Sequence, residues 1–178
     1  MKPTDVPHLA RHMMGQHGLL ELGWKFRWDG AKRRAGRCDY QNKAIQLSRH
    51  YADLNCADRP EDVVDTILHE IAHALIPGHG HDDVWKAKCV EIGANPMRCY
   101  DSAVVRMPDP RYQATCGGCG RKYSRHKRLR LSTAGWAYCP GCGPDAGRLC
   151  FVDNRAPTAV QRHHQQQPET PPTPKKLR

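Results

Sequence analysis

The sequence lacks any long, unbroken run of apolar residues. No stretch approaches the length of a membrane-spanning helix, and the first residues, MKPTDVPHLARHMMGQHG, have no apolar core of the kind that a signal peptide requires. We therefore expect a cytoplasmic protein that is not secreted, nucleoid-associated in a bacterium or nuclear in a eukaryote.

Acidic residues are scarce relative to basic ones. The chain has 28 Lys and Arg against 18 Asp and Glu, which gives a formal net charge of +10. An excess of this size suggests a polyanionic partner, and DNA is the partner that we expect. A basic protein that is merely soluble would show the same charge, so composition alone leaves both interpretations open.

The nine cysteines cannot all be paired with one another, because their number is odd. Four of them form two CxxC pairs, and in a reducing compartment this pattern favours metal binding over disulfides. The other five are expected to be small core residues: Cys38, Cys56, Cys89, Cys99 and Cys150.

The spacing of apolar residues predicts an α+β fold for the first part of the chain. Residues 5–22 carry apolar side chains near helical spacing, and we expect a helix there. WKFRW (24–28) alternates aromatic with basic residues, which indicates a strand with one buried face. Residues 36–40 and 44–48 add two short strands, so the prediction is a small, mostly antiparallel sheet.

Two further helices are predicted after the sheet. The stronger one lies in DRPEDVVDTILHEIAHALI, with Asp58 as its N-cap, Pro60 in its first turn and apolar residues in rows along it. Pro77 and Gly78 end this helix, and the next one is expected from about residue 82 to residue 92.

Composition divides the chain into three parts. Residues 98–152 are rich in glycine and in paired cysteines, whereas the sequence from Asp153 onward has no aromatic and no periodic apolar residues. We therefore expect a first domain over 1–97, a small module over 98–152 and a disordered tail over 153–178.

The stretch HEIAHALIPGHGHDDVW (69–85) contains four histidines in thirteen positions. His69 and His73 are four residues apart on the predicted helix, so they project from one face and can share a metal ion. Glu70 completes the HExxH pattern of metalloproteases, in which the glutamate is the general base. The pattern also arises by chance, with two histidines merely at a helix surface, but here it lies within an apolar helix and further histidines follow.

On the residues alone, the third metal ligand is either His79 or His81. His79 follows His69 at the spacing of the metzincins, but metzincins have glycine where this chain has Ile76. His81 lies four residues before Trp85, at the beginning of the next predicted helix, which would fix its direction.

Several stretches occur in a fixed order: GWKFRWDGAKRRAGRCDYQNKAIQLSRHY, HEIAHAL, GHGHDDVWKAKC and a CxxC…CxxC pattern. From about residue 15 to residue 152 the chain thereby resembles the SprT-like family, the Spartan-type zinc proteases that depend on DNA. The resemblance implies a minimal zincin-type metalloprotease domain with His81 as the third zinc ligand, within an HGxxW/F element. Asp82 stands where the family usually has glycine. The resemblance also implies that proteins bound or crosslinked to DNA are cleaved.

The ligand set indicates a reaction type. Three neutral imidazoles leave a zinc ion its full charge and one open coordination position, where a water molecule becomes acidic. Glu70 would accept the proton of this water as it attacks a peptide carbonyl, and would return it to the leaving amine. A purely structural zinc ion would have a fourth ligand and no need of Glu70.

A second zinc ion is expected in the 98–152 module. CGGC and CPGC form a CxxC-x19-CxxC pattern that is typical of a zinc ribbon, with the ligands Cys116, Cys119, Cys139 and Cys142. A redox role fits poorly, because it needs a single CxxC on a βαβ unit.

The segment RKYSRHKRLR, between the two cysteine pairs, has no acidic residue. We expect its basic side chains to contact DNA: Arg121, Lys122, Arg125, Lys127, Arg128 and Arg130. Tyr123, Trp136 and Tyr138 could stack on bases. The simpler interpretation is that the charges form a solvated face and that the rings pack in a core.

The sequence leaves two alternatives to a DNA-dependent zinc metalloendopeptidase. The first is a non-catalytic, DNA-binding zinc protein, against which an intact Glu70 argues. The second is a metalloprotease that acts independently of DNA and whose ribbon only braces the fold.

Overall fold

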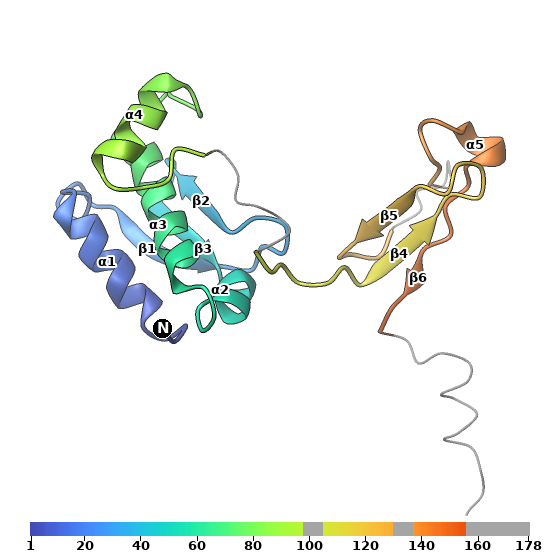
Figure 1. Ribbon diagram of the computed structural model, residues 1–178, viewed down its shortest axis with the longest axis horizontal. Helices are drawn as coiled ribbons and strands as arrows, with labels where there is room; N and C mark the ends of the chain where they lie inside the picture. Colours follow the sequence, from blue (N-terminus) through green and yellow to red (C-terminus); the bar gives the residue numbers. More distant parts are fainter. Residues whose placement is uncertain (98–104, 130–136, 156–178) are drawn as a thin grey trace, which may run out of the picture. The chain divides into compact units, whose positions relative to one another are not determined.

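The computed structural model describes residues 1–97, 105–129 and 137–155 (Figure 1). They form two compact units, Met1–Pro108 and Asp109–Arg178, and each is described by itself. The first unit is α+β, as the apolar spacing predicts. Its elements are α1 (Val6–Gln16), β1 (Lys25–Asp29), β2 (Gly36–Asp39), β3 (Ala44–Ser48), α2 (Arg49–Asn55), α3 (Pro60–Leu75) and α4 (Asp83–Glu91).

The sheet of the first unit is mixed, with the strand order β1-β3-β2. β2 pairs with β3 in the antiparallel sense, but β1 is parallel to β3, so the prediction of a mostly antiparallel sheet was wrong for β1. The reason is the connection between β1 and β2, which crosses the end of β3 instead of forming a hairpin. Ser48 anchors this connection, because its hydroxyl donates to the Ala31 carbonyl (2.6 Å) and its backbone N–H donates to the Ala35 carbonyl (2.7 Å).

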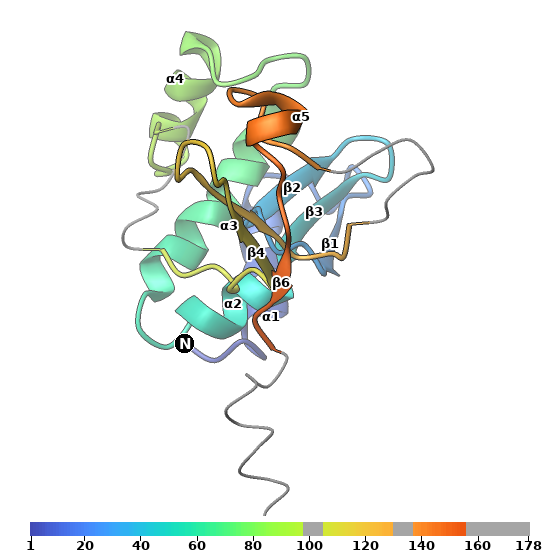
Figure 2. The ribbon, with the colours of Figure 1, turned by 90° about the vertical axis from the view of Figure 1, so that its right-hand side faces the viewer.

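The core lies between the sheet and the helices α1 and α3. Figures 1 and 2 show α3 running beside the sheet, and its Ile67 and Ile71 are fully buried in the same apolar cluster as Ile45 and Leu47 of β3. Trp24 is buried in this cluster, and Phe26 and Trp28 are partly buried and pack against it, on the side that their alternation predicts. Burial of these side chains is the main source of stability for the unit.

The helices differ from the prediction mainly at their ends. α1 ends at Gln16, because the chain turns through Gly18 at φ +69° and buries Leu19. α3 begins at Pro60 without a side-chain cap, so the prediction of Asp58 as its N-cap was wrong. None of the helices within the described ranges combines the length and the apolar character that crossing a membrane requires.

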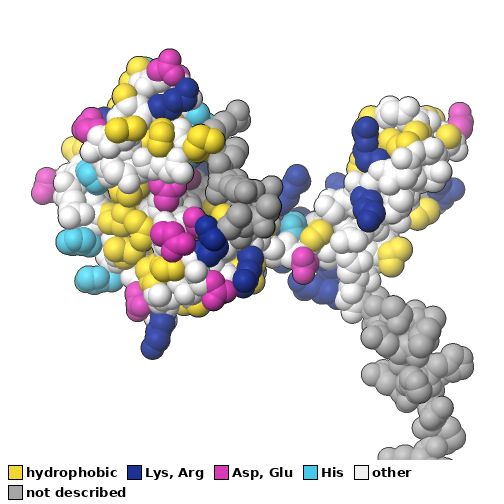
Figure 3. Space-filling model, in the orientation of Figure 1, with side chains coloured by type: hydrophobic (Ala, Val, Ile, Leu, Met, Phe, Trp, Pro, Cys, Tyr) yellow, Lys and Arg dark blue, Asp and Glu magenta, His cyan; other side chains and the backbone are white. Residues whose placement is uncertain are grey.

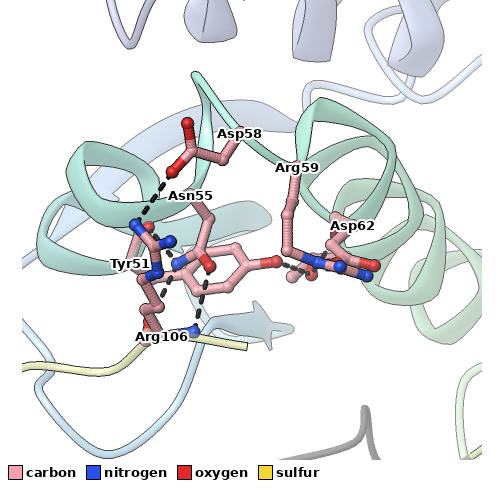
Figure 4. A network of polar contacts seen from close by, with 7 residues as sticks. Tyr51, Asn55, Asp58, Arg59, Asp62 and Arg106 are labelled. Carbon is pink, nitrogen blue, oxygen red and sulfur yellow. Dashed lines mark hydrogen bonds and ion pairs between the residues drawn. The ribbon is translucent and has the colours of Figure 1, made fainter. Parts of the chain in front are cut away.

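Residues beyond 97 continue the first unit (Figure 4). The side-chain amide of Asn55 donates to the Arg106 carbonyl (2.8 Å) and accepts from the Arg106 backbone N–H (3.0 Å). The Arg106 guanidinium donates to Asp58 (2.8 Å), and Val105 is buried in the core. The boundary between the units therefore lies after Pro108 and not after residue 97.

The second unit is a small antiparallel sheet with the strand order β5-β4-β6. Its elements are β4 (Tyr112–Thr115), β5 (Lys122–Arg125), the short helix α5 (Gly143–Ala146) and β6 (Val152–Asp153). Asp153 pairs with Tyr112, and its carboxylate binds the Arg111 guanidinium. Asp153 thus belongs to the sheet, and the backbone N–H of Asn154 donates to the Arg111 carbonyl (2.7 Å), so the expected tail does not begin at Asp153. Residues 156–178 of the expected tail lie outside the described residues.

Candidate metal centres

Three histidines of the first unit converge on one point. His69 and His73 project from one face of α3, and His81 approaches them from the segment before α4. The Nε2 atom of His81 lies 3.1 Å from that of His69 and 3.2 Å from that of His73. One ring nitrogen of each histidine lies within 4.8 Å of the others, so the group could hold a metal ion.

His79, the alternative third ligand, is not in this group. Its Nδ1 lies 2.9 Å from the carboxylate of Asp82, and its side chain is exposed. Asp82 also caps α4 by accepting from the Trp85 backbone N–H at 3.0 Å. Asp82 therefore holds His79 beside the beginning of α4, away from the point where the other three imidazoles meet.

Trp85 supports all three imidazoles. Its ring is fully buried, and its centroid lies 4.7 Å from that of His69, 5.2 Å from His73 and 4.6 Å from His81. It stacks on His73 and meets the other two rings edge to face. Packing against one rigid indole restricts the rotamers of the three histidines and prepares them to bind one ion.

The electrostatics of the cluster suit a metal ion. Burial, followed by the neighbouring histidines, lowers the pKa of His69 to about 4, and burial likewise lowers the pKa of His73. Neutral imidazoles each offer a lone pair, and three of them facing one point cannot satisfy one another by hydrogen bonding. The donor set therefore fits a divalent ion of the kind that prefers nitrogen ligands.

Glu70 lies beside the histidine cluster but is not part of it. Its side chain is buried against β2, where a Cβ on Gly36 would come within 2.7 Å of Oε1, and it accepts a hydrogen bond from the Cys38 backbone N–H. Burial raises the pKa of Glu70 to about 7, while the Cys38 N–H and the charge of Arg34 oppose this shift. A carboxyl group with such a pKa can both accept and donate a proton near neutral pH.

β2 supplies several site residues that sequence reasoning missed: Gly36, Cys38 and, just after the strand, Tyr40. The Tyr40 hydroxyl donates to the His73 carbonyl at 2.8 Å and so ties this edge of the sheet to α3. Burial is the first cause that raises the pKa of Tyr40 to about 12, so its hydroxyl stays protonated. A glycine at the start of an alternating strand often marks a close approach, and this was the available signal.

A cavity of about 870 Å³ opens over the histidines and Glu70. Arg33, Arg34 and Arg37 line one part of it, and Asp62 and Asp65 of α3 line another. The size is in the range of ligand pockets, and a chain segment of a few residues could enter it.

The four predicted ribbon cysteines of the second unit also come together: Cys116, Cys119, Cys139 and Cys142. Their sulfur atoms lie within 4.8 Å of one another, so the group could hold a second metal ion. The Tyr123 hydroxyl donates to Cys139 Sγ at 3.0 Å, which is the first cause that lowers the pKa of Cys139 to about 6. A low pKa favours the thiolate, which is the form that binds metal. The hydrogen bond with Cys119 is the first cause that raises the pKa of Cys142 to about 12, because neighbouring thiols without a cation between them do not all ionise.

None of the described cysteines forms a disulfide. Outside the ribbon group, Cys56 and Cys89 are buried as expected, whereas Cys38 is half-buried beside the cavity. Cys150 is exposed, so the expectation of a core residue was wrong there. Cys99 lies outside the described residues.

The basic segment of the second unit is largely exposed, and Figure 3 shows Lys and Arg side chains along the visible face of this unit. Tyr138 is 51% exposed, whereas Tyr123 is half-buried against Cys139. Arg130 and Trp136 lie outside the described residues. The exposed basic residues of the prediction are Arg121, Lys122, Arg125, Lys127 and Arg128.

Together, the α+β fold and the helix-borne histidines with a carboxyl group beside them define a metalloprotease-related domain. Residues 8–106 match the model of the SprT-like family, and this match covers more than half of the chain. The chain therefore belongs to the SprT-like family, as the motifs indicate. Comparison with curated proteins and with solved structures returned no match.

Proposed function

We propose that the chain is a zinc-dependent metalloendopeptidase that cleaves proteins bound or crosslinked to DNA. The observation that carries the proposal is the convergence of His69, His73 and His81 next to the buried carboxyl group of Glu70. Membership of the SprT-like family supports the same reaction class.

The roles follow from the positions of the residues. His69, His73 and His81 would hold the zinc ion, which when bound supplies Lewis acidity and acidifies water. Glu70 would accept a proton from the attacking water and deliver it to the leaving amine, because its carboxyl group is buried beside the three histidines. Trp85 keeps the imidazoles oriented, and Cys38 holds the Glu70 carboxyl group through its backbone N–H.

In the second unit, Cys116, Cys119, Cys139 and Cys142 would hold a structural zinc ion. The exposed arginines and lysines that follow the first cysteine pair would contact DNA phosphates. DNA would then bring the enzyme and a DNA-bound substrate together, which raises the effective concentration of the scissile chain.

The test is cleavage of a purified DNA-binding protein, with and without DNA, by the zinc-loaded wild type and by Glu70→Gln. Glu91→Gln is the matched control, because Glu91 is an exposed acid on α4 that forms an ion pair with Lys88. We expect DNA-stimulated cleavage by the wild type and by Glu91→Gln, and none by Glu70→Gln.

The other outcomes identify the alternatives. Equal cleavage with and without DNA would point to a metalloprotease that acts independently of DNA. DNA binding without any cleavage by the zinc-loaded wild type would point to a non-catalytic DNA-binding protein. Full activity of Glu70→Gln would refute the assigned role of Glu70.

A further inference from the structure

The charges of the first unit are segregated along the sequence. Residues 25–43 hold seven Lys and Arg against two Asp, a balance of +5. The rest of residues 1–108 holds eight Lys and Arg against twelve Asp and Glu, a balance of −4. The unit as a whole is nearly neutral, so its positive charge is concentrated on the strands β1 and β2 and on the segments that link the three strands.

The two faces of the sheet differ in character. Gly36 and Cys38 of β2 face α3. A Cβ on Gly36 would touch Glu70, and the charge of Glu70 raises the pKa of the Cys38 thiol after the larger effect of burial. Ile45 and Leu47 of β3 lie in the core, on the same side. Because side chains alternate along a strand, the residues between them lie on the opposite face, which we call the outer face.

The strand register aligns basic residues on the outer face. Arg27 of β1 and Arg37 of β2 are both paired with Gln46 of β3, so the three form one row across the sheet. Residues in such a row share a face, and the two arginines lie on either side of β3, about 10 Å apart between backbones. Lys25, two residues before Arg27, lies on the same face in the next row.

These cations are available to a partner. Lys25, Arg27 and Arg37 are exposed, and among the described residues none of them forms an ion pair with an acidic side chain. The acids nearby are otherwise engaged: Asp29 binds the Arg34 guanidinium, and Asp39 is buried and accepts from Asn42 and Gln46. Asp29 and Asp39 lie on the same face, and Asp39 is in the row of Lys25 and close to Arg37, so they offset part of this charge. Because Asp29 is neutralised by Arg34, the outer face remains positive on balance.

The positive charge continues to the edge of the cavity. Arg33 and Arg34, in the segment just before β2, line the cavity above the histidines and Glu70. On the side that Figure 3 shows, by contrast, acidic side chains are prominent over the helices of this unit. A polyanion would be attracted to the sheet side and repelled from the helical side.

We propose that the outer face of the β1-β3-β2 sheet is a second nucleic-acid-binding surface, which holds the phosphate backbone through Lys25, Arg27 and Arg37. The proposal deepens the proposed function and rests on it for its purpose, because DNA on this face would pass the rim of the cavity. Nothing in the basic segment of the second unit requires such a surface, so the two can be tested separately.

The chemistry of the face favours a phosphate backbone over other partners. Its aromatic neighbours lie on the other face of β1, where Trp24 is buried in the core cluster and Phe26 and Trp28 pack against it, so the outer face offers no ring for base stacking or for a protein hot spot. The strands have no exposed large apolar residue that would insert into a membrane. Long cationic side chains on an open sheet suit sequence-independent phosphate contacts.

The experiment compares two triple variants of the full, zinc-loaded chain. The first is Lys25→Gln, Arg27→Gln and Arg37→Gln, and the control is Lys2→Gln, Arg11→Gln and Lys86→Gln. The control removes the same charge from exposed positions of the same unit, away from the sheet. Binding of fluorescein-labelled duplex and single-stranded DNA is measured over a range of salt concentrations, together with zinc content and thermal unfolding.

We expect the sheet variant to bind DNA about tenfold more weakly or worse, and to lose about 2 to 3 units of salt slope, because each phosphate contact contributes about 0.9 on a duplex. The control should change both quantities much less. Arg27→Gln alone, at the centre of the face, should lower the slope by about 1 and serves as the test if the triple variant loses zinc or stability.

Several results would overturn the proposal. Equal weakening in both triple variants would mean that only net charge matters, and an unchanged salt slope in the sheet variant would mean a solvated face. Weaker binding of the sheet variant to polyglutamate or to phosphatidylserine vesicles, with its DNA binding unchanged, would assign the face to another partner. A wild type that binds DNA through this face but cleaves no peptide would refute the proposed function and leave this proposal standing.

Discussion

Gly36 of β2 and the carboxyl group of Glu70 on α3 lie in direct contact. A Cβ on Gly36 would come within 2.7 Å of Glu70 Oε1 and 2.9 Å of its Cγ, closer than real Cβ atoms approach other heavy atoms. The Glu70 carboxyl group can therefore occupy its position only because residue 36 is a glycine.

The first prediction is that Gly36→Ala displaces this carboxyl group. The added methyl group must push Glu70 aside, and we expect kcat for a peptide substrate to fall at least about tenfold, because a shift of about 1 Å costs this much or more. Overpacking should also cost about 1–3 kcal/mol of stability. Gly30→Ala is the control, because nothing lies within 4 Å of its Cβ position. Normal kcat in Gly36→Ala with full zinc content would contradict the assigned geometry.

The second prediction concerns the stability of the metal-free protein against pH. Burial raises the pKa of Glu70 from 4.5 to about 7. As the pH rises, Glu70 therefore loses its proton in the unfolded chain before it does so in the folded protein. The free energy of unfolding then decreases between pH 4.5 and about pH 7. The loss should be about 3 kcal/mol in all. Metal-free Glu70→Gln should lack this decline and be the more stable protein at pH 8. Denaturant unfolding of both proteins at pH 4 and pH 8 measures how much the free energy of unfolding of each one changes. An equal change in the two proteins would show that Glu70 does not cause the decrease.

The third prediction concerns the histidine cluster. His81→Ala should release one zinc ion per chain, because its Nε2 lies 3.1 Å from that of His69 at the point of convergence. His79→Ala should retain the ion, since His79 contacts Asp82 instead. Metal analysis of the purified variants decides between them. Loss of zinc in His79→Ala alone would show that the metzincin-like spacing is the correct one.

The fourth prediction concerns the ribbon. Tyr123→Phe removes the hydroxyl that donates to Cys139, so the pKa of Cys139 should rise and protons should compete better with zinc. We expect zinc affinity of the second unit to fall about tenfold, with the larger effect below pH 7. Tyr138→Phe, at an exposed tyrosine, is the control. Chelator competition at pH 6 and pH 8 measures both, and equal affinity of the two variants would contradict the role of Tyr123.

The fifth prediction concerns the basic segment after the first cysteine pair. Neutralising Arg125, Lys127 and Arg128 together should lower the salt slope of DNA binding by about 2 to 3. It should leave the zinc content intact, because no cysteine changes. Cleavage of a DNA-bound protein should fall much more than cleavage of a short peptide. If binding and slope stay the same, the ribbon only braces its unit.

The sequence determined the elements and the chemistry that depend on local spacing. The alternation of Trp24, Phe26 and Trp28 predicted the first strand, and apolar rows predicted the long helix, because periods of 2 and 3.6 residues are local properties of the chain. His69 and His73 are placed on one face by the same helical period, and CxxC turns bring their cysteines together within four residues. The family was also evident from ordered motifs, and the match over residues 8–106 confirms it.

Only the tertiary structure decided the relationships between segments that are distant in sequence. It directed His79 to Asp82, the cap of α4, and left His81 to join the histidine cluster. It also placed Gly36 against Glu70 and inserted β3 between β1 and β2. It also joined Arg106 to Asn55, which moved the boundary of the first unit, and gathered Lys25, Arg27 and Arg37 on one face of the sheet. No local period encodes such contacts, because they depend on strand register, on packing and on hydrogen bonds that form only when the whole unit closes around its core.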